Sequence, residues 1–378
     1  MTKRKVEKLE RELAEQKQAL KAIRRDFSRN DSRSSVCVRG KELTIRKPKV
    51  SADIFSRTVL TDSTWQYVEI YLKSVGQNEA LFFWQQARNF YEATTSLSLV
   101  SKPLTAYYCF LNATKALLES KSWGYDLSHG VTGKRLNGHI NILNEVVKFQ
   151  PRGVGAALGD YLGERTPPGG EEFTLKQIFY NLAYIHRAFT LTYGNMAELF
   201  IPVLEPRFVF DKSRKKAWLE IKLEEEHSSK RTLGRLIGYS LDNLYENSSQ
   251  YTMRRNKCFD WDAPRGVPTE ESLQKLHDYH RARRKELRYI YSPNSLWYVK
   301  RKDLKNDIVD KSTLTLTYAA MHRLSELSRY NPQVLDKHLS KDSSWLISEF
   351  INKSIYQFID QISSEITGND FRVTGFRE

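Results

Sequence analysis

The chain has 378 residues, of which 40% are hydrophobic and 12% aromatic, and its formal net charge is +15. This composition predicts two or three domains with sizeable cores and argues against wholesale disorder. No apolar run reaches the roughly 18 residues of a membrane helix, and the basic N-terminus lacks the apolar segment of a secretory signal.

Three cysteines, Cys37, Cys109 and Cys258, are scattered along the chain. An odd and widely spaced set without a CxxC pair indicates no disulfide framework. We therefore expect reduced thiols in a cytoplasmic protein.

The positive charge is concentrated in two blocks. Residues 1–50 hold 16 Lys and Arg against 7 Asp and Glu, and residues 207–305 hold 23 against 14. Such blocks favour a polyanionic partner, either nucleic acid or an anionic membrane surface. The alternative is that the charge serves solubility alone.

Residues 1–35 are predicted to form a basic, coiled-coil-like arm. Between residues 5 and 27, apolar residues repeat in a heptad pattern that is broken once, by Gln16. In a parallel pair the flanking charges attract each other, which predicts a homodimer through residues 5–27. The alternative is a helix that packs on its own domain, because about three heptads make a short seam.

Residues 36–200 are predicted to be a helical domain. A polar linker with one short strand leads into long helices over residues 63–120, where apolar residues recur at helical spacing. Residues 121–172 are rich in glycine and proline and are predicted to be loops around short elements. Thr174 then caps a helix that ends at Gly194.

Residues 201–310 are predicted to form a small antiparallel α+β insertion with two β-hairpins. Alternating apolar residues place one strand within 207–223, and a second hairpin is expected at 287–300. Helical patterns lie between them, near 230–247 and 269–286.

Residues 311–378 return to a helical pattern that is interrupted at Pro332 and stops at Gly368. These helices are expected to pack back on the helical domain. The predicted fold class is therefore mostly α: a helical bundle with a small α+β insertion and an N-terminal coiled-coil-like helix.

The densest polar cluster is SHGVTGKRLNGH, residues 128–139. Glycines let backbone amides approach a ligand, while Lys134 and Arg135 suit a phosphate. We single out His129, Arg135 and His139 as candidate catalytic residues, because a histidine can act as a general base near neutral pH. The alternative is a glycine-rich connection whose polar groups satisfy one another. The sequence contains no standard nucleotide-loop, metalloprotease or zinc-finger motif, so no cofactor and no metal are predicted.

A second basic cluster follows His277 and His280. These two histidines share a helix face, but no third ligand is fixed by spacing, so metal binding stays an open alternative. Cations interleaved with tyrosines suit phosphates and bases, although a solvated helix end is the plainer explanation. The predicted nucleic-acid-binding residues are Lys134, Arg281, Arg283, Arg284, Lys285, Arg288 and Tyr289.

Several stretches resemble the YaaC-like family of bacterial proteins. They are KPLTAYYCFLNATKALLESK (102–121), SHGVTGK (128–134), FTLKQIFYNLAYIHRAF (173–189) and LSELSRYNPQVLDKHL (324–339), and the resemblance spans roughly residues 60–366. The family is uncharacterised, so the resemblance implies a common fold and little mechanism.

The helical half distantly resembles HEPN domains, many of which are ribonucleases. Their nuclease signature is an arginine followed by a histidine after four to six intervening residues. Arg135 and His139 have only three residues between them, and Lys134 stands where arginine is needed. The sequence therefore departs from this signature.

We expect a nucleic-acid-binding accessory protein, one that the family-level association places in bacterial stress or phage defence. One alternative is a HEPN-related ribonuclease effector that uses the 128–139 loop. Another is a dimeric protein-interaction subunit without nucleic-acid contact.

Overall fold

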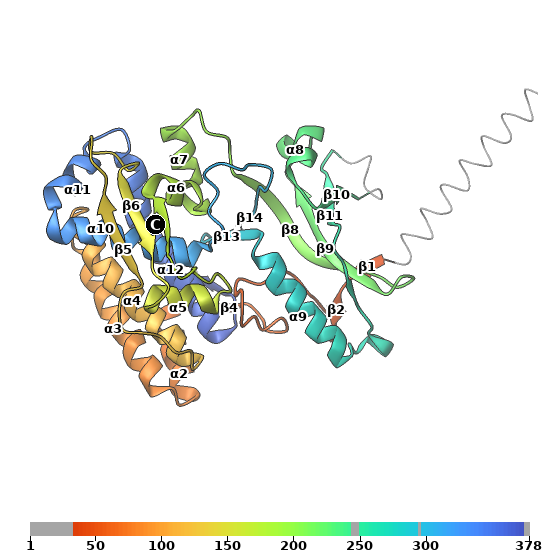
Figure 1. Cartoon of the computed structure of the whole chain (residues 1–378). Helices are drawn as coiled ribbons and strands as arrows, with labels where there is room; N and C mark the ends of the chain where they lie inside the picture. The colour runs from red at the N-terminus through yellow and green to blue at the C-terminus, as the bar shows by residue number, and fades with distance from the viewer. Residues whose placement is uncertain (1–32, 243–248, 294–295, 374–378) are drawn as a thin grey trace, which may run out of the picture. The chain divides into compact units, whose positions relative to one another are not determined.

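The computed structural model describes residues 33–242, 249–293 and 296–373, which form two compact units (Figure 1). The smaller unit takes its described residues from 33–45 and 204–279, and the larger from 46–203 and 280–373. The smaller unit thus adds an N-terminal segment to part of the predicted 201–310 insertion. The predicted coiled-coil-like helix at 5–27 lies outside the described residues.

The core of the larger unit is helical, as predicted. Its principal helices are α2 (Thr64–Ser74), α3 (Asn78–Thr95), α4 (Lys102–Ser120), α10 (Thr313–Tyr330) and α12 (Ser344–Thr367). The helices α3 and α4 lie side by side (Figure 1). Phe110 of α4 stacks on Phe358 of α12 with 4.2 Å between the ring centroids, and both side chains are buried. Aromatic burial of this kind is a large contribution to the core.

Local sequence signals set several helix ends. The Ser63 hydroxyl accepts a hydrogen bond from the Gln66 amide and caps α2. Pro103 lies in the first turn of α4, as expected. Gly368 ends α12 in the left-handed conformation, at φ +76°, where a side chain would also meet the Ser51 carbonyl.

The helix predicted from Thr174 to Gly194 is shorter and broken. Thr174 does cap a helix, through a capping box with Gln177, but this α6 (Leu175–Tyr180) soon ends. A 3₁₀ turn (Ala183–Ile185) and α7 (His186–Thr192) follow it. The buried Asn181 explains the break, because its side chain bonds the Gln177 and Asp307 carbonyls and accepts from the Val309 amide.

A three-stranded antiparallel sheet replaces much of the predicted loop region in the larger unit. It consists of β5 (Val131–Arg135), β6 (Glu145–Phe149) and β7 (Glu171–Thr174), in the order β5-β6-β7. Two further short helices complete the unit, α5 (Val154–Tyr161) and α11 (Pro332–Leu339). The prediction of loops around short elements did not identify these strands, because five-residue strands near glycines carry a weak periodic signal.

Strand content is larger than predicted. The hairpin at 287–300 is confirmed as β13 (Leu287–Ile290) and β14 (Leu296–Lys300), and β14 pairs with the first residues of β8 (Phe200–Asp211). Near the end of the described chain, β15 (Phe371–Val373) runs parallel to β4 (Val59–Thr61).

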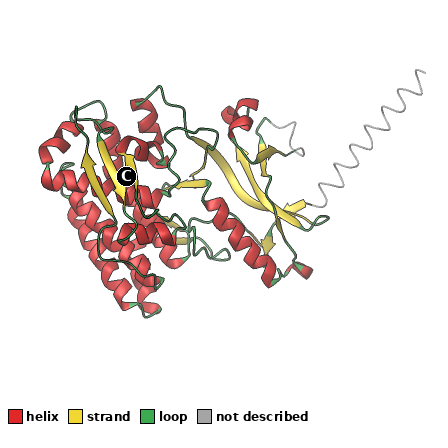
Figure 2. Cartoon of the chain, viewed as in Figure 1, coloured by secondary structure: helices red, strands yellow, loops and turns green. Residues whose placement is uncertain are grey.

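Strands dominate the smaller unit (Figure 2). The remainder of β8 pairs there with β9, confirming the predicted strand within 207–223. The other elements are β1 (Arg33–Ser35), β2 (Cys37–Val38), β3 (Lys41–Glu42), β9 (Lys216–Leu223), α8 (Lys230–Arg235), β10 (Tyr239–Leu241), β11 (Thr252–Arg255), β12 (Phe259–Asp260) and α9 (Glu270–Arg284), whose last turns belong to the larger unit.

The fold class is therefore mixed α/β rather than mostly α. Helix accounts for 45% and strand for 20% of the described residues. This is too much strand for a helical bundle with a small insertion. The described residues include an eight-stranded antiparallel sheet with the path β10-β11-β9-β8-β14-β13, to which β1 and β12 also pair. Within the described part of the chain, we find no helix long and apolar enough to cross a lipid bilayer.

Candidate functional site

His129 is the best placed of the predicted catalytic residues. It lies just before β5 with an exposed side chain, and its Nδ1 is 2.6 Å from the Tyr107 hydroxyl of α4. That hydroxyl is 3.1 Å from the Tyr318 hydroxyl of α10, which in turn donates to the His129 carbonyl at 2.9 Å. The three contacts form a closed ring that begins and ends on His129.

The ring assigns the protons of the imidazole. Each hydroxyl has one proton, and Tyr318 uses its proton on the His129 carbonyl. Tyr107 must then donate to the Tyr318 oxygen, because otherwise two lone pairs would face each other at 3.1 Å. Tyr107 therefore accepts from Nδ1–H of His129, and Nε2 carries the free lone pair of a general base.

The surroundings keep this histidine neutral. Partial burial and the charge of Lys115 lower the pKa of His129. Burial raises the pKa of Tyr107, so its hydroxyl stays protonated. The neighbouring ring of His322 is 5% exposed, its Nδ1 has no hydrogen-bond partner within the described residues, and burial with the nearby His129 lowers its pKa to about 3.

The other residues of the 128–139 loop have separate environments. Arg135 ends β5 with its Nε 3.8 Å from Glu145, a buried carboxylate that Arg323 binds at 2.7 Å. Lys134 is exposed and pairs with an exposed glutamate of β7. His139 is exposed in the following turn, and its ring makes no hydrogen bond within the described chain. The structure therefore places His129, and not His139, beside other titratable side chains.

Most of the second basic cluster is inside the larger unit. Arg283 is buried and pairs with Glu286 at 3.0 Å. Arg284, Arg288 and Tyr289 are buried too. Of the predicted residues in this second cluster, only Arg281 and Lys285 are exposed. Five of the nine Lys and Arg residues between positions 280 and 305 are buried: Arg283, Arg284, Arg288, Lys300 and Arg301. Five of the 23 Lys and Arg residues of the second charge block, all of them after position 280, are thus not available at the surface.

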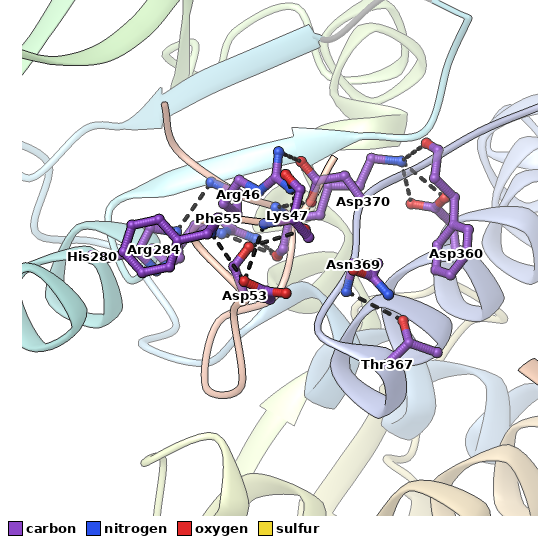
Figure 3. Close-up of polar contacts among 12 residues, drawn as sticks. Arg46, Lys47, Asp53, Phe55, His280, Arg284, Asp360, Thr367, Asn369 and Asp370 are labelled. Atoms are coloured by element: carbon purple, nitrogen blue, oxygen red, sulfur yellow. Dashed lines mark hydrogen bonds and ion pairs between the residues drawn. The ribbon is translucent and has the colours of Figure 1, made fainter. Parts of the chain in front are cut away.

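The segment from Arg46 to Lys49 supplies a partner for one of these buried cations, Arg284, and adds a buried lysine of its own (Figure 3). The Lys47 ammonium binds Asp360 of α12 at 3.0 Å, and the Lys47 carbonyl accepts from Arg284 at 2.8 Å. Burial lowers the pKa of Lys47, but the Asp360 carboxylate more than offsets this, so the pKa lies above its ordinary value. For Arg284, whose guanidinium donates to backbone carbonyls, burial outweighs the nearby Glu365 carboxylate and lowers the pKa to about 10.

A cavity of about 20 Å³ lies among these charges. Its charged lining residues are Lys47, Lys49, Arg284, Arg288 and Glu365. The Lys49 ammonium is paired with Glu164, a carboxylate that also accepts from the Ser312 amide at 2.7 Å. Predicted residues of the second basic cluster thus meet around one internal cavity.

The smaller unit has a pocket of about 330 Å³ lined by three arginines. Arg33 pairs with Asp242 at 2.8 Å, and Arg214 is 3.8 Å from Asp211. Arg254 has no carboxylate partner within the described residues, and its guanidinium lies 4.1 Å from the centroid of the Trp218 ring. Partial burial and the positive charge of Arg33 lower the pKa of Arg254.

Metal ligation by His277 and His280 gains no support. The His280 Nε2 accepts a hydrogen bond from the Arg46 amide at 3.1 Å, so that nitrogen is already engaged. Glu224, Glu226 and His227 form a group with ligand atoms within 4.8 Å of one another. Exposed acidic groups commonly lie together without a metal, and this group carries no proposal.

Sequence reasoning missed Tyr107, Tyr318, His322 and Lys47 as site residues. One signal was available: Tyr318 and His322 are four residues apart and share a face of α10, and polar groups on an otherwise apolar helix face need partners. For Lys47 there was no usable signal, since a basic residue in a polar linker is normally solvated.

We predict that His322 makes the protein sensitive to mild acid. Its pKa is about 3 in the folded state against 6.5 for the unperturbed group, so the unfolded state binds the extra proton and stability falls as pH falls through this range. Lowering the pH from about 7.5 to about 5.5 should cost the wild type about 1.4 kcal/mol more than His322→Phe. Urea unfolding at both pH values measures the difference.

The matched control is His139→Phe, because that ring is exposed and should leave the pH dependence of the wild type intact. An identical loss of stability in the wild type and in His322→Phe would contradict the prediction. The groups that face His322 are His129, Arg323 and Glu326, the last at 3.9 Å.

Comparison with known proteins finds one relationship. The family model described as YaaC-like Protein matches residues 55–366. Neither the search of curated proteins nor that of solved structures finds a match. The similarity of the helical half to HEPN domains stays a prediction. Because the matched region covers well over half of the 378 residues, the chain belongs to the YaaC-like family.

Proposed function

We propose that the protein binds nucleic acid through the sugar-phosphate backbone, with the arginine pocket of the smaller unit as the contact. The observation that carries this proposal is Arg254, a guanidinium crowded by Arg33 and Arg214. It makes no ion pair within the described residues, because Asp242, the acid of the same pocket, is paired with Arg33. A phosphate would neutralise this crowding and accept two parallel hydrogen bonds from one guanidinium.

The N-terminal arm supports the same proposal by its charge. Residues 1–32 contain 10 Lys and Arg against 6 Asp and Glu. Phosphate contacts of this kind supply affinity without sequence specificity. The proposal therefore describes a cytoplasmic accessory protein that recognises the backbone and not the bases.

We predict that Arg254→Gln weakens binding to a short duplex by about tenfold, since one charge-assisted hydrogen-bond pair is lost. It should also reduce the slope of log affinity against log salt by about 0.9, the value for one phosphate contact. Fluorescence anisotropy of a labelled duplex and of a labelled single strand, over a salt series, measures both quantities.

The control is Arg231→Gln, which removes an exposed arginine of α8 that does not line the pocket. It should leave the affinity within about twofold, as for an uninvolved surface charge. Equal effects of the two substitutions would mean diffuse attraction to a basic surface, and binding by neither variant nor the wild type would remove the proposal.

The predicted dimer adds avidity to this scheme. We propose that residues 5–27 pair two copies, so that two arginine pockets engage one nucleic acid. Deleting residues 1–32 should halve the mass seen by light scattering and weaken binding by about 100-fold. The variant Leu13→Asn/Leu20→Asn keeps the arm's charges but breaks its apolar seam, so it separates dimerisation from charge. An unchanged mass in both variants would argue against the seam.

A second candidate function, ribonuclease activity, rests on the proton assignment at His129. The free lone pair on Nε2 could take the proton of an RNA 2′-hydroxyl, whose oxygen then attacks the adjacent phosphorus. The bond from phosphorus to the 5′-oxygen breaks, and the leaving oxygen takes a proton from water. The products are a 2′,3′-cyclic phosphate and a 5′-hydroxyl. This reaction resembles that of the HEPN ribonucleases, but it uses His129 without their arginine spacing.

We predict that any RNA cleavage by the wild type falls at least about 100-fold in His129→Ala, because general base catalysis is lost. Tyr107→Phe should reduce the rate as well, since Nδ1–H loses its acceptor and the tautomer is no longer fixed. His139→Ala is the matched control and should cleave normally. Intact RNA after long incubation with the wild type, or full activity in His129→Ala, would exclude this candidate.

A further inference from the structure

The cavity beside the first turn of α10 contains more positive than negative charge. Four cations line it: Lys47, Lys49, Arg284 and Arg288. Asp360 and Glu164 pair with the two lysines, and Glu365 is the only carboxylate in the lining itself. Asp310 and Asp370 also act on Arg288 and Arg284, but only the two lysines have a carboxylate bound directly. In a protein interior, a cation without a bound acceptor is costly.

Arg288 is the cation with the fewest partners. Its side chain is 6% exposed, its Nη2 donates to the Lys311 carbonyl at 3.3 Å, and its Nε has no hydrogen-bond partner within the described residues. Burial lowers the pKa of Arg288 even though Glu164 and Asp310 lie near enough to raise it, so the loss of hydration outweighs these carboxylates. A buried donor left unsatisfied in this way usually marks a missing acceptor.

The N-terminal end of α10 adds hydrogen-bond donors to the same cavity. Ser312, Thr313 and Leu314 line it, and they form the cap and first turn of an 18-residue helix. First-turn amides have no acceptor inside their own helix, and the helix dipole favours negative charge there. Glu164 already accepts hydrogen bonds from the Ser312 amide and the Thr315 hydroxyl. A carboxylate of the protein itself is thus already bound at this helix end.

We propose that this cavity binds a single small inorganic anion, chloride, between Arg288 and the first turn of α10. The size supports a monatomic ion: about 20 Å³ accommodates a particle close to a water molecule in size, and a phosphate group is larger. The donors support an anion, because the Arg288 Nε–H lacks an acceptor within the described residues and the first turn of α10 favours negative charge. This site is independent of the proposed nucleic-acid contact, which lies in the smaller unit.

The test compares the thermal stability of the full chain in sodium chloride, sodium bromide and sodium gluconate at equal ionic strength. The two halides should raise the Tm of the wild type by about 2 °C over gluconate, because they bind only the folded state. Arg288→Met should show no difference between the salts. Arg301→Met is the matched control: it removes an equally buried arginine that pairs with Asp303 away from the cavity, and it should keep the halide effect.

Crystals of the wild type grown in bromide give a second measurement that does not depend on a variant folding. An anomalous peak within about 3.5 Å of the Arg288 Nε would support the proposal. Equal Tm values in all three salts, or a cavity that scatters as water only, would overturn it. A halide effect that persists in Arg288→Met would also overturn it, since binding would then lie elsewhere.

Discussion

The buried pair between Lys47 and Asp360 is the constraint on which much of the larger unit depends. The same lysine ammonium also donates to the Phe371 carbonyl at 2.6 Å, while the Lys47 backbone binds Arg284 and Asp370. One residue thus ties α12, β15 and the end of α9 together within the unit. Two charges removed from water are stable only when each finds such a full set of partners, so the backbone around them has little freedom. This network also forms one wall of the internal cavity of about 20 Å³, because Lys47 lines that cavity.

The sequence predicts elements whose stabilisation is local. The long helices α3, α4 and α12 are recognised because their apolar stripes repeat with the helical period, and the β13–β14 hairpin because its strands are adjacent in the chain. The β5-β6-β7 sheet was missed because its strands are short. Its third strand follows its second only after α5 and a glycine-rich turn, and no local pattern reports a pairing of that kind.

The candidate site was predicted in part, and the reasons differ between residues. A glycine-rich polar loop rarely folds into a core, so the exposure of His129 follows from its neighbours. Its partners Tyr107 and Tyr318 are 211 residues apart in the chain, and only the tertiary fold brings them together. Charge reasoning was less successful at Arg284 and Arg288, because the sequence gives the sign of a charge but not whether it faces water. Their burial places charges expected on a polyanion-binding surface around an internal cavity instead.

The ring that joins His129, Tyr107 and Tyr318 makes the imidazole a terminus for protons and not a relay. A proton that arrives at Nε2 leaves every other bond of the ring unchanged. Passing a proton inward through Nδ1 would instead move one proton along each of the two tyrosine hydroxyls and leave the last on the His129 carbonyl, which is a very weak base. Proton exchange at His129 is therefore confined to Nε2, and the ring gives the interior behind it no path for a proton.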